Sequence, residues 1–93
     1  METELAPLIE KAAAALKAAG AREVYLFGSV SRGRLRPDSD VDIAVSGLPP
    51  EVFFQAMGKA SRAVGRPVDL IDLDVENPFT RYLKEQGRLQ RVG

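Results

Sequence analysis

Val24-Tyr25-Leu26-Phe27-Gly28-Ser29 and, after an interval of ten residues, Asp40-Val41-Asp42-Ile43-Ala44-Val45 determine the architecture of this chain. The first segment is a continuous apolar, β-prone run that stops at a glycine, which predicts a buried strand. The second segment alternates along its length, so Asp40 and Asp42 share one face of a second strand over 41–45. The residues between the two strands are polar and rich in Arg, Ser, Gly and Pro, and they predict a loop.

One helix is predicted on each side of this stretch. The upstream helix is capped by Thr3, tolerates Pro7 in its first turn and ends at Gly20. Its apolar stripe consists of Leu5, Leu8, Ile9, Ala12 and Leu16. The downstream helix covers Glu51–Val64 and ends before Gly65. Its stripe consists of Phe53, Met57, Ala60 and Val64.

The rest of the chain predicts a strand, a helix and an edge strand. Val68–Ile71 forms the third strand, and Asn77-Pro78 starts a helix that continues to about Gln86. Leu89–Val92 is a candidate edge strand. This order of elements predicts an α/β (α+β) fold, with a small mixed β-sheet flanked by helices. We expect the 93 residues to form one domain, 1–93.

Composition excludes several classes of site. The net charge is zero, which gives no general attraction to nucleic acid or to an anionic membrane. The chain contains neither cysteine nor histidine, so thiolate sites, disulfides and a Ser-His-Asp triad are excluded. A metal must be bound by oxygen, which favours magnesium or manganese. Because no segment resembles a signal peptide or a membrane span, we expect a cytoplasmic protein.

Gly28-Ser29 is the first candidate functional feature. Glycine permits a sharp turn, and the backbone N–H groups after such a turn can bind phosphate oxygens. The Ser29 hydroxyl adds a donor. On its own, however, the pair fits an ordinary turn.

Asp40 and Asp42 form the second feature. Two carboxylates about 4 Å apart repel by about 1 kcal/mol in water, and by about 4 kcal/mol at an effective dielectric of 20. A bridging cation removes that repulsion. The alternative is a loop residue, Asp40, followed by a solvated Asp42.

Asp69 interrupts the apolar run of the third strand, which is a poor position for aspartate. If this strand lies beside the 41–45 strand, Asp69 completes a cluster of three carboxylates. Alternatively the strand lies at an edge and Asp69 faces water. The cluster would suit a two-metal phosphoryl-transfer site, which needs no histidine.

Together, Leu26-Phe27-Gly28-Ser29, Arg32-Gly33 and Asp38-Ser39-Asp40-Val41-Asp42-Ile43 resemble the signature of the minimal nucleotidyltransferases, part of the polymerase-β-like nucleotidyltransferase superfamily. In that signature a Gly-Ser pair is followed, after ten residues, by Asp-x-Asp. The compound pattern is specific, although each half alone is not. The signature covers residues 26–45, and Asp69 with the order of helices extends the resemblance over most of the chain.

The resemblance implies the polymerase-β-like fold and a set of catalytic, metal-binding carboxylates. Asp40 and Asp42 would be shared by two Mg²⁺ ions, and Asp69 would bind the ion that activates the attacking hydroxyl. The residues that would bind the nucleotide are Gly28, Ser29, Arg32 and Ser39. For Arg32 the alternative, a solvated loop arginine, is nearly as well supported.

The resemblance also implies an activity and a partner. Stand-alone minimal forms are similar to antitoxins that pair with a helical HEPN-domain RNase toxin and transfer AMP to a tyrosine of it. We therefore expect AMP transfer from ATP to a hydroxyl of a HEPN-domain toxin, within a hetero-oligomer. Neither nucleic acid as a direct substrate nor a membrane is expected. Phe54, about 100° around its helix from Phe53, is either available to a partner or part of a wide buried face.

Two other functions remain open at this point. The chain could be a binding module that neutralises its partner by complex formation with the nucleotide site idle, in which case Asp40→Asn and Asp42→Asn leave the complex intact. It could also transfer nucleotides to a small molecule or a nucleic acid. Zero net charge and the absence of an acceptor domain argue against the latter.

Overall fold

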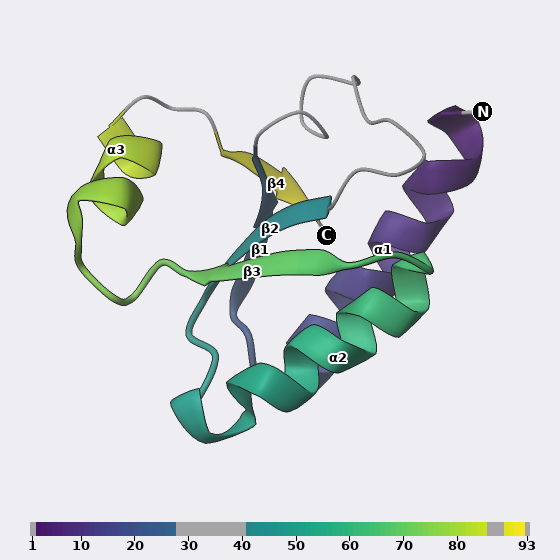
Figure 1. Ribbon diagram of the computed structural model, residues 1–93, viewed down its shortest axis with the longest axis horizontal. Coiled ribbons are helices and arrows are strands. Elements are labelled where there is room, and N and C mark those ends of the chain that lie inside the picture. Colours follow the sequence, from purple (N-terminus) through teal and green to yellow (C-terminus); the bar gives the residue numbers. More distant parts are fainter. Residues whose placement is uncertain (1, 28–40, 86–88, 93) are drawn as a thin grey trace.

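The structure, a computed structural model, describes residues 2–27, 41–85 and 89–92. The elements, in chain order, are α1 (Glu2–Ala19), β1 (Glu23–Leu26), β2 (Val41–Ser46), the 3-10 helix η2 (Pro50–Val52), α2 (Phe53–Val64), β3 (Val68–Asp72), α3 (Pro78–Glu85) and β4 (Gln90–Val92). The predicted order of helices and strands is confirmed, including the edge strand (Figure 1). In the described part of the chain, no helix is both long and apolar enough to cross a membrane.

The four strands form one mixed sheet in the order β3-β2-β1-β4. β1 pairs antiparallel with β2 and with β4, whereas β2 and β3 run parallel. A parallel pair requires a crossover, and here α2 makes it. The predicted α+β architecture with a small mixed sheet is therefore confirmed.

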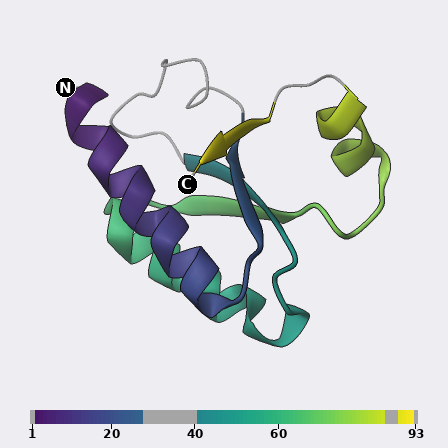
Figure 2. The same ribbon diagram turned by 180° about the vertical axis from the view of Figure 1, so that it is seen from behind.

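One face of the sheet packs on α1 and α2, which lie side by side (Figure 2). Strand alternation directs Val24, Ile43 and Leu70 into this core, where Leu16 of α1 is completely buried. The helices contribute small buried residues, among them Ala12 and Ala60, which allow their backbones to approach closely. This face therefore carries the larger core and leaves the other face for polar residues.

The opposite face of the sheet is only partly covered. Its buried cluster consists of Phe27, Ala44, Leu73 and Leu83, the last of them from α3. The α3 helix lies away from the paired α1 and α2 helices (Figure 1). Two of the predicted carboxylates lie on this second face, the half-buried Asp42 and the exposed Asp69.

Two helix starts differ from the prediction. The α1 helix begins at Glu2, so Thr3 lies inside the helix instead of capping it, and Pro7 lies beyond the first turn. Pro7 is exposed and precedes the buried residues of α1 that pack in the core, such as Ile9 and Leu16. The second helix begins at Phe53, because Pro50 opens a short 3-10 turn ahead of it.

The two glycine stops of α1 and α2 were predicted correctly. Gly65 follows α2 with φ 81°, and its N–H donates to the Ser61 carbonyl at 2.8 Å. A left-handed residue at this position is the common way to end a helix, and glycine adopts it without steric cost. The glycine therefore fixes where the crossover turns toward β3.

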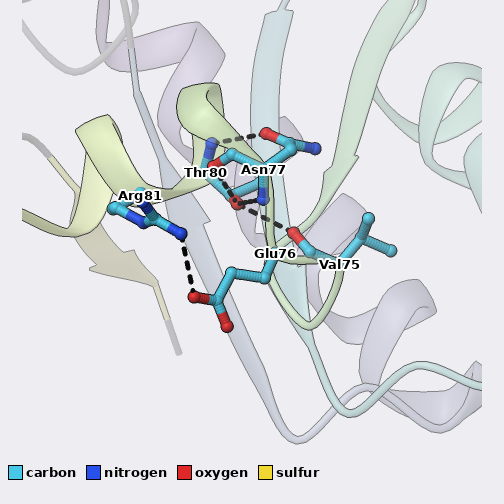
Figure 3. A network of polar contacts seen from close by, with 5 residues as sticks. All are labelled: Val75, Glu76, Asn77, Thr80 and Arg81. Carbon is cyan, nitrogen blue, oxygen red and sulfur yellow. Dashed lines mark hydrogen bonds and ion pairs between the residues drawn. The ribbon is translucent and has the colours of Figure 1, made fainter.

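The start of α3 is held by a reciprocal capping arrangement (Figure 3). Asn77 Oδ1 accepts a hydrogen bond from the Thr80 N–H at 2.9 Å, and Thr80 Oγ1 accepts one from the Asn77 N–H at 3.1 Å. The Thr80 hydroxyl also donates to the Val75 carbonyl at 2.8 Å, and this side chain is only 1% exposed. The arrangement satisfies N–H groups that a helix start leaves without partners.

We expect Thr80→Val to lower the free energy of unfolding by about 1–3 kcal/mol, because the Asn77 N–H and the Val75 carbonyl then lose the hydrogen bonds they make to the buried Thr80 hydroxyl. Urea unfolding followed by circular dichroism measures the change. Arg81→Gln is the matched control, since the Arg81–Glu76 ion pair at 3.1 Å is exposed. An exposed pair is worth about 0–1 kcal/mol. Equal losses in the two variants would contradict the capping role.

Candidate functional site

Asp42 of β2 and Asp69 of β3 lie directly opposite each other. The parallel register pairs Val41 with Val68 and Asp42 with Asp69. Ile43 and Leu70, one residue further along each strand, point into the α1–α2 core, so both carboxylates point to the other face. Neighbouring strands are about 4.8 Å apart, which brings the two carboxylates side by side.

Backbone hydrogen bonds on both sides hold the residues that carry this pair. The Val41 N–H donates to the Pro67 carbonyl at 3.0 Å, just before β3 begins. The Asp42 carbonyl accepts from the Phe27 N–H at 3.2 Å, just after β1 ends. The first two residues of β2 are thus hydrogen-bonded to segments on both sides, and Asp42 lies within a strand and not in a loop.

The structure places Asp69 at an exposed edge position and beside Asp42, while the predicted cluster of three carboxylates stays a prediction. β3 is an edge strand and Asp69 is exposed, as expected if this aspartate faces water. It is also the register partner of Asp42, which is half-buried. An exposed edge position lets the carboxylate meet a second molecule, whereas the paired position lets it share an ion with Asp42. Its role as a metal ligand stays a prediction.

The donor set fits a hard divalent cation. Both side chains offer carboxylate oxygens, which magnesium and manganese prefer, and a bound cation offsets the mutual repulsion of the pair. Within the described residues, no group of three or more acidic side chains is close enough to hold a metal. Asp40, the predicted third member, lies outside the described residues.

The predicted nucleotide-binding residues also lie outside the described part of the chain. These residues are Gly28, Ser29, Arg32 and Ser39. The described chain leads up to them on both sides, because β1 and Phe27 end immediately before Gly28, and β2 begins immediately after Asp40. Phe27, the last described residue before Gly28, is hydrogen-bonded through its N–H to the Asp42 carbonyl at 3.2 Å.

Residues 10–89 match the family model for Polymerase beta, Nucleotidyltransferase. The chain belongs to this nucleotidyltransferase family. The match covers most of the sequence and includes every predicted site residue. Among curated proteins, none matches the chain.

Solved structures agree with the nucleotidyltransferase assignment. A protein described as a minimal nucleotidyltransferase superposes with a TM-score of 0.78 at 23% identity, over 99% of this chain and 94% of that one. A toxin–antitoxin complex with AMP-PNP gives 0.72 at 27% identity, over 87% and 68%. A tri-AMPylated HEPN toxin from Shewanella oneidensis, in complex with an MNT antitoxin, gives 0.66 at 24% identity, over 98% and 71%.

Two contacts of this nucleotidyltransferase domain were not predicted from the sequence. The Phe79 ring of α3 packs against Phe27, with ring centroids 5.9 Å apart and an interplanar angle of 67°. Asp74 accepts hydrogen bonds from the Gly47 N–H at 2.6 Å and from the Ser46 hydroxyl at 3.2 Å, which ties the end of β2 to the turn after β3. An Asn-x-x-Thr pattern at 77–80 does mark the start of α3, but no local pattern shows which strand that helix contacts.

A polar cluster lies on the same face of the nucleotidyltransferase sheet, at the β1–β4 edge. Tyr25 is opposite Arg91 in the register, and Arg91 forms an ion pair with Glu23 at 3.8 Å. Burial raises the pKa of the Tyr25 phenol, and a hydrogen bond to Glu23 and the charge of Glu23 raise it further. Arg91 opposes this shift by stabilising the phenolate. The neutral phenol is therefore the form that the fold favours.

We expect Tyr25 to ionise above the ordinary tyrosine pKa of 10.0. The stabilisation from this raised pKa is complete below pH 10 and is lost as the pH rises through the folded-state pKa. Tyrosinate absorbance during alkaline titration of Tyr82→Phe reports Tyr25 alone, since the chain has two tyrosines. Adding Glu23→Gln should lower the titration midpoint. A titration midpoint at 10.0 in Tyr82→Phe would contradict the expected effect of burial and of Glu23 on the pKa of Tyr25.

A separate groove of about 590 Å³ lies between α1 and β4. Its lining consists of Ile9, Glu10, Ala13, Ala14, Lys17, Leu26, Gln90, Arg91 and Val92. Neither Asp42 nor Asp69 takes part, and Ile9 and Leu26 belong to the α1–α2 core. The groove is therefore on the other side of the sheet from the carboxylates and lies apart from the candidate site.

Proposed function

We propose that this nucleotidyltransferase domain transfers AMP from ATP, with Mg²⁺, to a hydroxyl of a HEPN-domain toxin, and that it acts as the antitoxin of that partner. The observation that carries the proposal is the in-register pairing of Asp42 with Asp69 on the free face of the sheet. Two facing carboxylates repel each other, and a divalent cation bound between them offsets that repulsion. The family match supports the reaction type.

Under this proposal the carboxylates bind the metal and residues between β1 and β2 bind the nucleotide. Asp40, Asp42 and Asp69 hold magnesium, while Gly28, Ser29, Arg32 and Ser39 hold the triphosphate. Magnesium bound there would neutralise phosphate charge and favour the ionised form of the acceptor hydroxyl. Asp42 and Asp69 orient the reactants from rigid strands, so that positioning and charge neutralisation account for most of the rate.

The reaction balances without any redox partner. The acceptor oxygen attacks the α-phosphorus of ATP and forms a new P–O bond. The bond from that phosphorus to the bridging oxygen of the β-phosphate breaks, and pyrophosphate leaves with the bonding electrons. The proton of the hydroxyl passes to solvent. The exposed position of Asp69 at the sheet edge is suited to an acceptor carried by another protein, which must approach from outside.

The structural neighbours support the kind of partner. One is a toxin–antitoxin complex with AMP-PNP, an ATP analogue, and another contains an AMPylated HEPN toxin beside an MNT antitoxin. Phe54, exposed over 78% of its surface, offers this chain an apolar contact for a partner, on α2. The exposure, which was one of the two alternatives for Phe54, is confirmed.

The test begins with calorimetric titration of the chain with ATP, first with magnesium and then with EDTA. The expected result is binding that EDTA abolishes. The chain is then incubated with Mg-ATP and a helical HEPN-domain protein encoded by a neighbouring reading frame. Mass spectrometry should show the addition of adenylyl groups to that protein, with release of pyrophosphate.

The second candidate function is a non-catalytic antitoxin, which the exposed Phe54 favours independently of the carboxylates. In that case the complex forms and silences the toxin while Asp42→Asn has no effect on neutralisation. Phe54→Ala should then weaken the complex, whereas the catalytic proposal requires Asp42.

A further inference from the structure

Three exposed apolar side chains gather on α3 and on the turn that precedes it. Val75, Phe79 and Tyr82 are 53%, 45% and 50% exposed. Phe79 and Tyr82 are three residues apart on the helix, so their rings lie on neighbouring positions of its surface. The buried side of α3 consists of Thr80 and Leu83, so neither ring is needed to close the core.

Phe79 links this surface to the candidate site. Its ring packs edge-on against Phe27, with centroids 5.9 Å apart, and it remains nearly half exposed. Phe27 is the cross-strand neighbour of Asp42, to whose carbonyl its N–H donates. Phe27 also immediately precedes Gly28 in the sequence. Phe79 and Tyr82, called the aromatic surface below, therefore lie beside the face of the sheet that carries Asp42 and Asp69. The Phe27 ring lies between this surface and β1.

Phe27 connects the strand that carries Asp42 to the rings of α3. Its backbone is one strand spacing, about 4.8 Å, from that of Asp42, and its ring centroid is 5.9 Å from that of Phe79. A nucleotide whose phosphates lie near Asp42 would therefore have the rings of α3 on the same side of the sheet, next to the ring of Phe27.

The backbone of α3, which carries both rings, is held at each of its turns. The reciprocal Asn77–Thr80 hydrogen bonds hold the first turn of α3, and Phe79 lies inside that turn. Leu83, buried in the second-face cluster, fixes the following turn. Preorganised aromatic side chains lose little conformational entropy on binding, which favours a flat, weakly polar ligand such as a nucleobase.

We propose that Phe79 and Tyr82 form a stacking surface for the base of the nucleoside triphosphate. This inference rests on the proposed nucleotidyltransferase function and adds the subsite that receives the base. Every base has a π-face that can stack, so the affinity of this surface should depend more on the size of the base than on its hydrogen-bonding groups. ATP and GTP should bind similarly, and both should bind more tightly than CTP or UTP.

The experiment compares ATP with inorganic tripolyphosphate, which lacks a base, both titrated by calorimetry with magnesium. Phe79→Leu, Tyr82→Leu and the double variant keep an apolar side chain but remove the aromatic face. We expect the double variant to bind ATP roughly ten-fold more weakly and tripolyphosphate as the wild type does. Tyr82→Phe should bind ATP like the wild type. Gln55→Ala, which removes an exposed side chain from α2, is the control and should change the binding of neither ligand.

The outcomes separate the inference from the function on which it rests. If the wild type binds neither ligand, the nucleotide site itself is wrong, and this inference falls with it. If the wild type binds both ligands equally, or the double variant binds ATP normally, only the stacking surface is wrong. Equal weakening of ATP and tripolyphosphate would also overturn it, because the variants would then have disturbed the phosphate site. Normal ATP binding with loss of a protein partner would assign the surface to docking.

Discussion

Asp42→Asn is expected to reduce nucleotidyl transfer by roughly a thousand-fold, because the substitution removes a charge that stabilises the transition state through its cation. The amide has nearly the same shape as the carboxylate, and the Asp42 backbone bonds to β1 do not involve the side chain. The substitution also removes one of two facing like charges. The circular dichroism spectrum and cooperative unfolding should therefore be retained, while pyrophosphate release and adenylylation are lost.

Two further variants make this result specific. Asp69→Asn should also lower activity sharply, since it removes the other half of the pair. Glu51→Gln removes one exposed negative charge from η2, away from the carboxylate face, and should leave the rate within about two-fold of the wild type. Transfer at the wild-type rate in both aspartate variants would rule out the catalytic proposal and would favour a docking antitoxin.

Leu16→Ala is expected to have the largest effect on stability, a loss of about 2–5 kcal/mol in the free energy of unfolding. Leu16 is completely buried at the contact between α1 and the sheet, and its neighbours include small residues that cannot expand to fill a cavity. Domains of this size are stable by about 5–15 kcal/mol, so the loss is a large part of the total. Chemical denaturation with a fixed slope measures it.

Phe54→Ala is the control for this prediction. It removes a larger apolar side chain from a position that is 78% exposed, where the one described ring contact is with Phe53 at 5.5 Å. We expect a loss of about 1 kcal/mol or less. A loss in Phe54→Ala that equals the loss in Leu16→Ala would mean that burial does not determine stability at these positions.

Local patterns were sufficient for most of the elements. Alternation in 41–45 and the apolar run before Gly28 predicted two strands, and Asn77-Pro78 predicted the start of α3 to the residue. Helix boundaries that depend on tertiary packing were predicted less well. The α1 helix extends through Pro7 to Glu2, whereas the local capping pattern at Thr3 predicted a later start.

The candidate site was also only partly predictable from local sequence patterns. Alternation alone places Asp42 on a polar face, but its pairing with Asp69 depends on the parallel register between β2 and β3, which neither segment specifies by itself. For Asp69 the structure shows both the edge position and the neighbour, Asp42, that the sequence alone left open. The Phe27–Phe79 contact brings together an early strand and a late helix, so only the folded chain shows it.

The crossover from β2 through α2 to β3 also bears on how the protein is made. Asp42 and Asp69 lie on opposite sides of α2 in the sequence, so they meet only after a long loop has closed. Contacts of this non-local kind are slow to form, and parallel strands form them more slowly than hairpins do. A nascent polypeptide on the ribosome therefore has no acidic pair until β3 has emerged and docked. If the proposed function holds, chains released before that point would lack the carboxylate pair to which Mg²⁺ is proposed to bind.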